Sequence, residues 1–500
     1  FGFSASTEYV HRAAPAPPCG SGRMSPMTAP HPVHVFVQDA LGDADATEVA
    51  ELIRKKEVSA TEVCQAAVTR AQRAQPLIEA VECTDYDRAV ASADGLTSGV
   101  FAGVPTFVKD NVDVAGLPTN HGTQAFVAEP ARKDSPFVGQ LQALGLNVLG
   151  KSRLPEFGFS ASTEYVHRGP VRNPWNPAYS AGASSGGSAA LVAAGVVPIA
   201  HANDGGGSIR IPAAACGLVG LKPTRGRLVA DPAETQLPVR IVTQGVLTRS
   251  VRDTASFYAG AEAYWRNPRL PPVRSVEGPG RTRLRIGVLL DSPNGVATDD
   301  ETRACVQSTA DLLSRLGHHV EETTSPVGAR FADDFSLYWA LLGLLVTTTG
   351  RRVIDPGFDA TRTDDLTRGL ARMCRRRLAG TPGMLYRLRR ITHEYRKVFT
   401  RLDVVLSPVL THTTPAIGHL SPTLPFEELF PRLQAYVGFT PLNNASGGPA
   451  ISLPLGATSN GLPIGCQLAA DLGDERTLLK LAFELEAARP WSRIQDAGAG

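Results

Sequence analysis

Cysteine is scarce in this sequence and never clustered. The seven cysteines among 500 residues stand singly at positions 19, 64, 83, 216, 305, 374 and 466, and no CxxC pair occurs. Zinc sites and thiol redox centres need cysteines or histidines at short, regular spacing. An odd, scattered set is typical of a reduced chain inside the cell. We therefore predict a cytoplasmic protein that uses neither a metal nor an organic cofactor.

The sequence also lacks long apolar runs and an excess of one charge. No run approaches the roughly 18 apolar residues of a membrane span, and the first residues do not show the basic and apolar regions of a secretion signal. The net charge is only +2 at pH 7, which favours neither nucleic acid nor a membrane as a partner. The expected partner is a small molecule. The oligomeric state stays open, with a homodimer as one option.

The N-terminus repeats an internal segment. Residues 1–12 and 157–168 both read FGFSASTEYVHR, and a Pro-, Ala- and Ser-rich stretch follows the first copy. Structural repeats diverge and recur at a regular period, which this copy does not. We interpret it as an artefact of the gene model or a recent duplication, with Met24 or Met27 as the natural start. Residues 1–40 are predicted to be a disordered tail that is dispensable up to about residue 35.

Short apolar runs alternate with helical patterns along the rest of the chain. VPTFVK, LNVLGKS and VVPIAHA are typical of buried strands, and QLQALG and SSGGSAALVAAG of helices. Ser59 and Glu62 form the capping box of an early helix. This alternation predicts an α/β fold, with a large mixed, mostly parallel sheet flanked by helices.

A polar, Pro-rich connection at 266–283 precedes a second strand–helix–strand pattern. The strand at 284–290 and the amphipathic helix at 301–317 open a segment that stays helical to about residue 401. We predict a smaller inserted α/β lobe at about 284–401 within one domain at 41–495. LDVVLSPV and GPAISLPLG then return as core strands.

The densest set of small polar residues lies at 179–226. A Gly run ends in Ser208, a candidate nucleophile, and its successive N–H groups can form an anion-binding nest. Alone, this pattern also fits a flexible Gly/Ser loop. A phosphate loop is disfavoured, because GASSGG lacks a Lys-Ser/Thr ending and no GxGxxG follows a strand.

One lysine stands within an apolar strand. The chain has only eight lysines, and burial of Lys109 in VPTFVK would lower its pKa. The alternative is a surface lysine at a strand end. A Ser-His-Asp reading of His201, Asp204 and Ser208 is disfavoured, since such triads draw on separate loops. We predict that His201 is a core or pocket-edge residue and that Asp204 and Arg210 brace the loop.

These segments resemble the amidase signature enzymes over about residues 45–490. The matching pieces, in order, are GVPTFVKDNVDVAGLPTNHGT, LGKSRLPEFGFSAST, RNPWNP, GASSGGSAA, NDGGGSIRIPAAACGLVGLKPTRGR, GVLTRSVRD, FTPLNNASGGPAISLPLG and GLPIG. NDGGGSIRIP and the C-terminal stretch are most similar to bacterial enzymes of the 6-aminohexanoate cyclic dimer hydrolase type.

The resemblance implies catalytic roles. Ser208 would be the nucleophile, Ser184 the bridging serine beside a cis peptide bond, and Lys109 the base. The backbone N–H groups of Gly205, Gly206, Gly207 and Ser208 would form the oxyanion hole. Gly205 departs from the commoner Thr-Asp-Thr-Gly-Gly wording, which alters loop stiffness and one pocket wall. Lys151 and Lys222 match structural positions.

The implied activity is hydrolysis of a carboxamide to a carboxylate plus ammonia or an amine, through a seryl acyl-enzyme. Two alternatives stay open: a glutamine-hydrolysing subunit of a tRNA-dependent amidotransferase complex, and a non-catalytic binding protein on the same fold. Pocket walls are expected from 124–136, 327–350 and 410–440. Phe439 and the Leu-rich run at 337–346 favour an apolar pocket.

Overall fold

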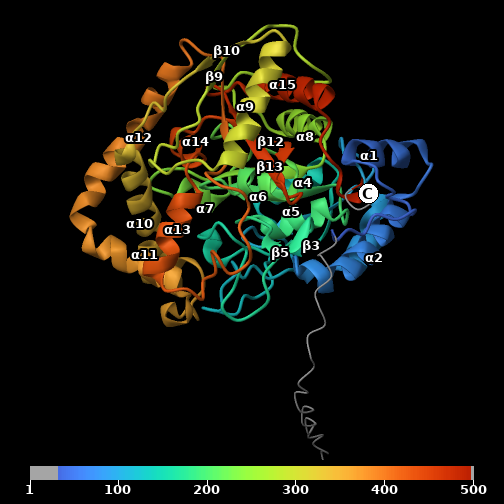
Figure 1. Cartoon of the computed structure of the whole chain (residues 1–500). Helices are drawn as coiled ribbons and strands as arrows, with labels where there is room; N and C mark the ends of the chain where they lie inside the picture. The colour runs from blue at the N-terminus through green and yellow to red at the C-terminus, as the bar shows by residue number, and fades with distance from the viewer. Residues whose placement is uncertain (1–31, 497–500) are drawn as a thin grey trace, which may run out of the picture. The chain divides into compact units, whose positions relative to one another are not determined.

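The computed structural model describes residues 32–496. Its largest feature is an eight-stranded sheet, around which the helices are arranged (Figure 1). The predicted strands and helices all appear close to their expected positions, so the mixed α/β prediction is confirmed. In spatial order the strands are β10 (His319–Glu322), β9 (Arg285–Val288), β11 (Val404–Pro408), β13 (Pro463–Ala469), β12 (Ala450–Ala457), β7 (Val219–Lys222), β8 (Thr243–Thr248) and β6 (Ile199–Asp204).

The strand directions correct one part of the prediction. Only β10–β9 and β9–β11 are parallel neighbours, and the other pairs of this sheet are antiparallel, so "mostly parallel" is wrong. The β6–α6–β7 unit does give two strands of the same direction, but β8 lies between them and runs against both. A short turn joins β12 to β13, which forces a hairpin. Strands that alternate with helices in the sequence predict the relative direction of the two strands in one strand–helix–strand unit. They do not predict which other strand will lie between those two in the sheet.

A three-stranded sheet extends the large one. Its order is β1 (Val81–Thr84), β3 (Asn147–Ser152) and β2 (Pro105–Lys109). Side chains connect β2 to β6: the Thr106 hydroxyl donates to the Ile199 carbonyl at 3.0 Å, and the Lys109 backbone N–H donates to His201 Nδ1 at 3.1 Å. The C-terminal end of β2 is therefore fixed beside β6. A small hairpin, β4 (Arg172–Asn173) with β5 (Asn176–Ser180), completes the strands.

Most helices pack on the sheets through one main core, to which α1, α2, α5, α8, α9 and α15 contribute apolar side chains. The capping box predicted at Ser59 and Glu62 opens α2. The helices are α1 (Ala46–Lys55), α2 (Ala60–Ile78), α3 (Tyr86–Ser92), α4 (Pro136–Ala143), α5 (Gly186–Ala193), α6 (Arg210–Cys216), α7 (Pro232–Thr235), α8 (Val251–Tyr264), α9 (Asp300–Arg315), α10 (Ala329–Val353), α11 (Asp365–Arg376), α12 (Thr381–Val398), α13 (Phe426–Tyr436), α14 (Pro441–Ser446) and α15 (Glu475–Ala488).

A second apolar core is formed by side chains of helices α10, α11, α12 and α13. These helices lie together on one side of the strands in Figure 1. Its residues include Tyr338 of α10, Leu370 of α11 and Leu388 of α12. In the segment assigned to a smaller lobe, β9 and β10 pair within the large sheet, whereas α10 to α12 belong to this second core. The lobe boundaries stay a prediction.

The predicted N-terminal tail falls mostly on residues 1–31, including the first copy of the duplicated segment, and these lie outside the described residues. Within residues 32–40, Val33 and Val35 donate backbone hydrogen bonds to Pro174 and Ala194. Among the described helices, none combines the length and apolar character that a membrane crossing requires.

Candidate active site

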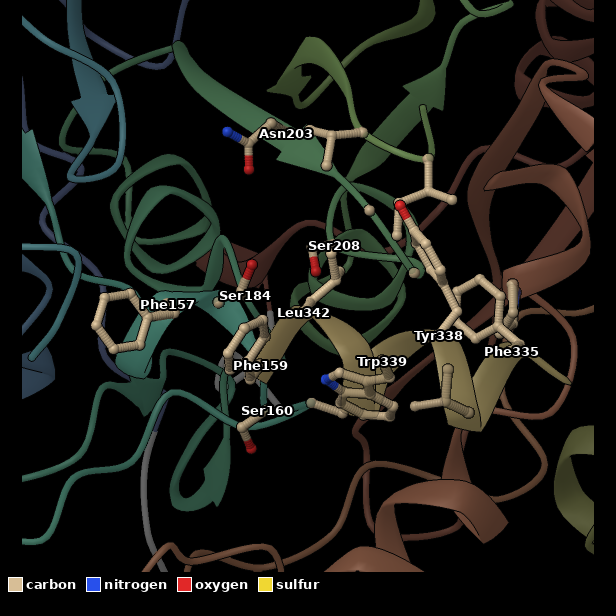
Figure 2. A pocket seen from close by; sticks show the side chains of 18 of the residues that line it. Phe157, Phe159, Ser160, Ser184, Asn203, Ser208, Phe335, Tyr338, Trp339 and Leu342 are labelled. Carbon is tan, nitrogen blue, oxygen red and sulfur yellow. The ribbon is translucent and has the colours of Figure 1, made fainter. Parts of the chain in front are cut away.

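A cavity of about 410 Å³ opens between the C-terminal ends of β2 and β6 and helix α10. Ser184, Asn203 and Ser208 lie on its polar side, while α10 supplies aromatic and aliphatic side chains opposite them (Figure 2). The internal copy of the duplicated segment forms another wall, through residues 157–161. The cavity is thus lined in part by residues of the segment 179–226, in which small polar residues are densest.

Lys109 and Ser184 are in direct contact. Lys109 is the last residue of β2 and is fully buried, and its Nζ donates to Ser184 Oγ at 2.6 Å. Ser184 lies just before α5, and the Ala183–Ser184 peptide bond is cis. Burial lowers the pKa of Lys109 to about 7, against a smaller opposite effect of the Asp204 carboxylate. A substantial fraction of the amine is therefore neutral near pH 7 and can accept a proton.

Two asparagines complete the surroundings of Lys109, and sequence reasoning missed both. Lys109 Nζ donates to Asn203 Oδ1 at 2.7 Å. The Asn203 amide is in turn held by Asn111: Asn203 Nδ2 donates to Asn111 Oδ1 at 3.0 Å, and Asn111 Nδ2 donates to Asn203 Oδ1 at 3.3 Å. Both residues stand in motifs that were recognised, KDN and NDGGGS. Their connection depends on β2 lying beside β6, which no local pattern reveals.

Ser208 lies in the loop between β6 and α6 and is half-buried on the same cavity. Within residues 32–496, its hydroxyl has no hydrogen-bond partner, and the N–H groups of Gly205, Gly206, Gly207 and Ser208 donate to no protein acceptor. Gly207 has φ +140, and a Cβ there would lie 2.5 Å from Thr440 Oγ1. Glycine is thus required at 207, and the loop presents unused backbone donors beside a free hydroxyl.

Gly205, where the sequence departs from the commoner family wording, lines the cavity. A Cβ at this position would lie 3.2 Å from Val242 Cγ2, and Val242 lines the cavity. A side chain at 205 would therefore press against Val242.

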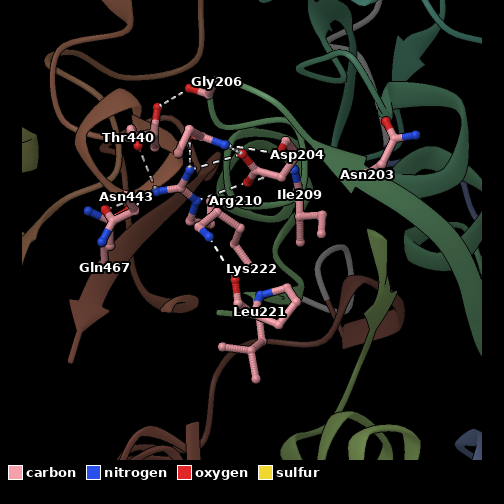
Figure 3. A network of polar contacts seen from close by, with 12 residues as sticks. Asn203, Asp204, Gly206, Ile209, Arg210, Leu221, Lys222, Thr440, Asn443 and Gln467 are labelled. Carbon is pink, nitrogen blue, oxygen red and sulfur yellow. Dashed lines mark hydrogen bonds and ion pairs between the residues drawn. The ribbon is translucent and has the colours of Figure 1, made fainter. Parts of the chain in front are cut away.

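A buried ion pair fixes the loop, as predicted (Figure 3). Arg210 and Asp204 are both fully buried, and two Arg210 nitrogens donate to the two Asp204 oxygens at 2.9 Å each. The remaining guanidinium donors reach α14 and β13, through the Thr440 carbonyl, Asn443, Asn444 and Gln467. Burial alone would raise the pKa of Asp204, but Arg210 outweighs it and the pKa falls to about 2. The start and end of the Ser208 loop are thereby joined to each other and to the sheet.

His201 is a core residue, as predicted. It is fully buried; its Nδ1 accepts the Lys109 N–H, and its Nε2 lies 2.8 Å from Gln244 Oε1. Burial lowers the pKa of His201 to about 3, so the ring is neutral. The other buried lysines also take structural places: Lys151 pairs with Asp110 at 3.0 Å, and Lys222 donates to the Pro223 carbonyl at 2.7 Å.

The apolar cavity wall comes mainly from α10, within the predicted stretch 327–350. Phe335, Tyr338, Trp339 and Leu342 face Phe157 and Phe159 across the cavity (Figure 2). Gln434, Val437 and Gly438 also contribute, as expected for 410–440. The expectation for 124–136 is wrong, since none of these residues is among those lining the cavity. Phe439 is buried and does not line this cavity; it lines a separate, smaller one together with Tyr395 and Leu442. Chain position alone does not show on which side of a loop an aromatic ring packs.

The polar part of the lining is acidic or neutral. Asp231 and Glu234 of the α7 segment reach the cavity, and Gln244 Nε2 donates to carboxylate oxygens of both. Burial raises the pKa of Glu234 to about 7. Among the described lining residues there is no arginine or lysine. The described part of the chain also gathers no group of His, Cys, Asp or Glu side chains that could hold a metal ion.

Comparisons with known proteins agree with the resemblance seen in the motifs. The family model described as Amidase matches residues 62–479. The protein named "Putative amidase AmiC" of Mycobacterium leprae (strain TN) is 51% identical over 466 residues, which cover 93% of this chain and 99% of that protein. The 6-aminohexanoate-cyclic-dimer hydrolase of Paenarthrobacter ureafaciens is 35% identical over 478 residues, covering 89% and 95%.

Solved structures place the fold in the same group. The structure of 6-aminohexanoate cyclic dimer hydrolase complexed with substrate superposes with a TM-score of 0.82 at 32% identity, and the alignment covers 91% of this chain and 99% of that one. The predicted similarity to the cyclic dimer hydrolases is confirmed. The identity to the AmiC protein is higher still. The chain belongs to the amidase signature family and is an enzyme that hydrolyses amide bonds.

Proposed function

We propose that this amidase acts through a seryl acyl-enzyme, with Ser208 as nucleophile, Lys109 as base and Ser184 as the relay between them. The observation that carries the proposal is the 2.6 Å contact between Lys109 Nζ and Ser184 Oγ, beside the cavity that Ser184 and Ser208 line; the Ser208 hydroxyl has no partner among the described residues. A serine hydroxyl is a weak nucleophile at neutral pH and needs an adjacent base. A buried, partly neutral lysine is such a base.

The steps balance without any further group. Neutral Lys109 takes the proton of Ser184, Ser184 takes that of Ser208, and Ser208 Oγ bonds to the amide carbon. The resulting oxyanion is bound by the free N–H groups of Gly205 to Ser208, and one such donor is typically worth about 10²–10³ in rate. The proton returns through Ser184 to the leaving nitrogen as the C–N bond breaks. Water then attacks the acyl-enzyme by the same relay and releases the carboxylate.

The cavity wall supports a neutral amide with an apolar group as substrate. Phe335, Trp339 and Leu342 offer apolar contact, and the described lining holds no cation that could bind a free carboxylate. Glutamine, the substrate of the alternative amidotransferase role, carries an α-carboxylate that would go unpaired beside Asp231 and Glu234. An uncharged linear or cyclic amide suits the cavity better. The cytoplasmic location, the lack of a nucleic-acid partner and the homodimer stay predictions.

A substrate panel with the purified chain tests this assignment. We expect kcat/KM for uncharged alkyl or aryl amides to exceed that for glutamine by at least about 10-fold, because an unpaired carboxylate must be desolvated in the cavity. Amides of equal length with and without a terminal carboxylate are the matched pair. Preference for glutamine, or for the carboxylated partner, would contradict the substrate class while leaving the enzyme class intact.

The proposed base predicts the acid side of the pH profile. Since Lys109 must be neutral and burial lowers its pKa to about 7, kcat/KM should fall about tenfold per pH unit below that value. As pH rises through 7, kcat/KM should rise, because deprotonation of Lys109 produces the active form. Glu234 also has a pKa of about 7, so the profile of Glu234→Gln serves as the control. An acid limb that disappears in that variant would assign the titration to Glu234 instead.

A further inference from the structure

Lys109 is surrounded by neutral hydrogen-bond partners, although two carboxylates lie close to it in the chain. Asp110 follows it directly and pairs with Lys151 at 3.0 Å. Asp204 follows Asn203 and is bound by Arg210 through two contacts of 2.9 Å. Each carboxylate is therefore matched by another cation. Within residues 32–496, no carboxylate lies within ion-pair distance of Lys109 Nζ.

The partner that Lys109 has in place of a carboxylate is the Asn203 amide. Its oxygen lies 2.7 Å from Nζ and can only accept, so it binds an N–H hydrogen in either protonation state of the amine. The Asn111 amide fixes the orientation of Asn203, because it donates to the same oxygen and accepts from the Asn203 nitrogen. A 180° flip of the Asn203 amide would place its NH₂ group against the Lys109 amine and break both contacts with Asn111.

This arrangement determines where the amine can direct its lone pair. With one hydrogen bound to Asn203 Oδ1, the neutral amine can turn its lone pair to Ser184 Oγ, which lies 2.6 Å away. We propose that Asn203, oriented by Asn111, is the positioning residue that aims the Lys109 amine at Ser184 and keeps negative charge away from it. The inference rests on the proposed function, in which Lys109 is the base.

A negative charge can be placed in direct contact with the Lys109 amine at position 203, without breaking any other ion pair. His201 faces Lys109 only through the backbone N–H, and its ring is neutral. Asp110 and Asp204 already have partners, Lys151 and Arg210. An aspartate at 203 would be the first carboxylate in direct contact with Nζ. An opposite charge at this distance commonly shifts a pKa by about 1–3 units.

The test compares pH profiles of kcat/KM for Asn203→Asp and wild type. We expect the acid limb to move to higher pH by at least about one unit, because the carboxylate favours the charged lysine. A rise of one to two units lowers the neutral fraction at pH 7 by about 5- to 50-fold. The control is Asn294→Asp, which places the same charge in the same cavity at a residue that bonds to Gln434 and not to Lys109. Its acid limb should stay in place.

Two further variants test whether Asn203 orients the Lys109 amine. Asn203→Ala should lower kcat by about 10- to 100-fold with little change in KM, since the amine loses its orientation but the substrate cavity stays. Asn203→Thr keeps an acceptor oxygen and should recover most of that loss.

If Asn203→Asp fails to fold, Asn111→Asp is the substitute. It adds the charge at a half-buried residue that contacts Asn203 and not Lys109 Nζ. The acid limb should move in the same direction, but by less.

The outcomes distinguish an error in the role of Lys109 as base from an error in the role of Asn203 as positioning residue. If Lys109→Ala stays active, the base assignment is wrong and the proposed function fails. If Lys109→Ala is inactive but neither aspartate variant moves the acid limb, the role of Asn203 alone is overturned. An equal shift in Asn294→Asp would also overturn it, because the effect would then belong to any charge in the cavity.

Discussion

Replacing Ser208 by alanine is expected to lower turnover of an amide substrate by about 10⁴- to 10⁶-fold, because nucleophile and base act as one unit. The fold should survive the change, since the hydroxyl is half-buried and has no partner in the described part of the chain. Lys109→Ala should cost nearly as much. The double variant should be no worse than Ser208→Ala alone, because each change already disables the same step.

The adjacent serines supply a matched comparison. Ser184 Oγ contacts Lys109 Nζ, whereas Ser185 Oγ donates to the Asn203 carbonyl at 3.3 Å. Ser184→Ala should therefore leave only a trace of activity, and Ser185→Ala should lose far less. The direct measurement is a rapid-quench burst of amine release, with an acyl adduct on Ser208 found by mass spectrometry. A full burst in Ser208→Ala, or His201→Ala as damaging as Lys109→Ala, would contradict the mechanism.

Local sequence predicted the elements of this fold better than their assembly. The apolar runs at β2, β3 and β6 and the capping box at Ser59 are short-range signals, and they lie where expected. The prediction of strand direction was wrong at β8, a strand from a later part of the chain that lies between β6 and β7. Which strand fills a gap between two others depends on long-range packing, and no hydrophobic period encodes it.

The site shows the same division. Lys109, Ser184 and Ser208 stand in motifs whose wording marks them, and the structure brings Lys109 and Ser184 into contact. Asn203 stands in a recognised motif too, NDGGGS, but the motif assigns it no role, and an asparagine near the end of a strand is ordinary. Its place beside Lys109 follows from the contacts that connect β6 to β2 through Thr106 and His201. The apolar wall on α10 was visible as a Leu-rich run, but the side on which Phe439 packs was not.

Replacing Arg210 by methionine is expected to lower the free energy of unfolding by about 3–5 kcal/mol, the cost of leaving a buried charge without its partner. Arg210 is fully buried and its guanidinium holds Asp204, α14 and β13 together. Methionine fills a similar volume but supplies none of these donors. Urea unfolding followed by circular dichroism measures the loss. Arg303→Met is the matched control: Arg303 is 40% exposed and pairs with an exposed Asp291, a pair worth about 0–1 kcal/mol.

The pH dependence of that loss identifies its cause. In the wild type the pKa of Asp204 is lowered to about 2, so its stabilising contribution is present above pH 4 and is lost as pH falls toward 2. Without Arg210, only Lys222 and Asn444 oppose the effect of burial on this carboxyl, so we expect its pKa to rise and the penalty to disappear once the group is protonated. The difference between wild type and Arg210→Met should therefore narrow as pH falls from 7 to 4. Adding Asp204→Asn to Arg210→Met should recover part of the loss at pH 7. If the difference stays constant with pH and the second substitution recovers nothing, the destabilisation comes from lost packing and not from the unpaired carboxylate.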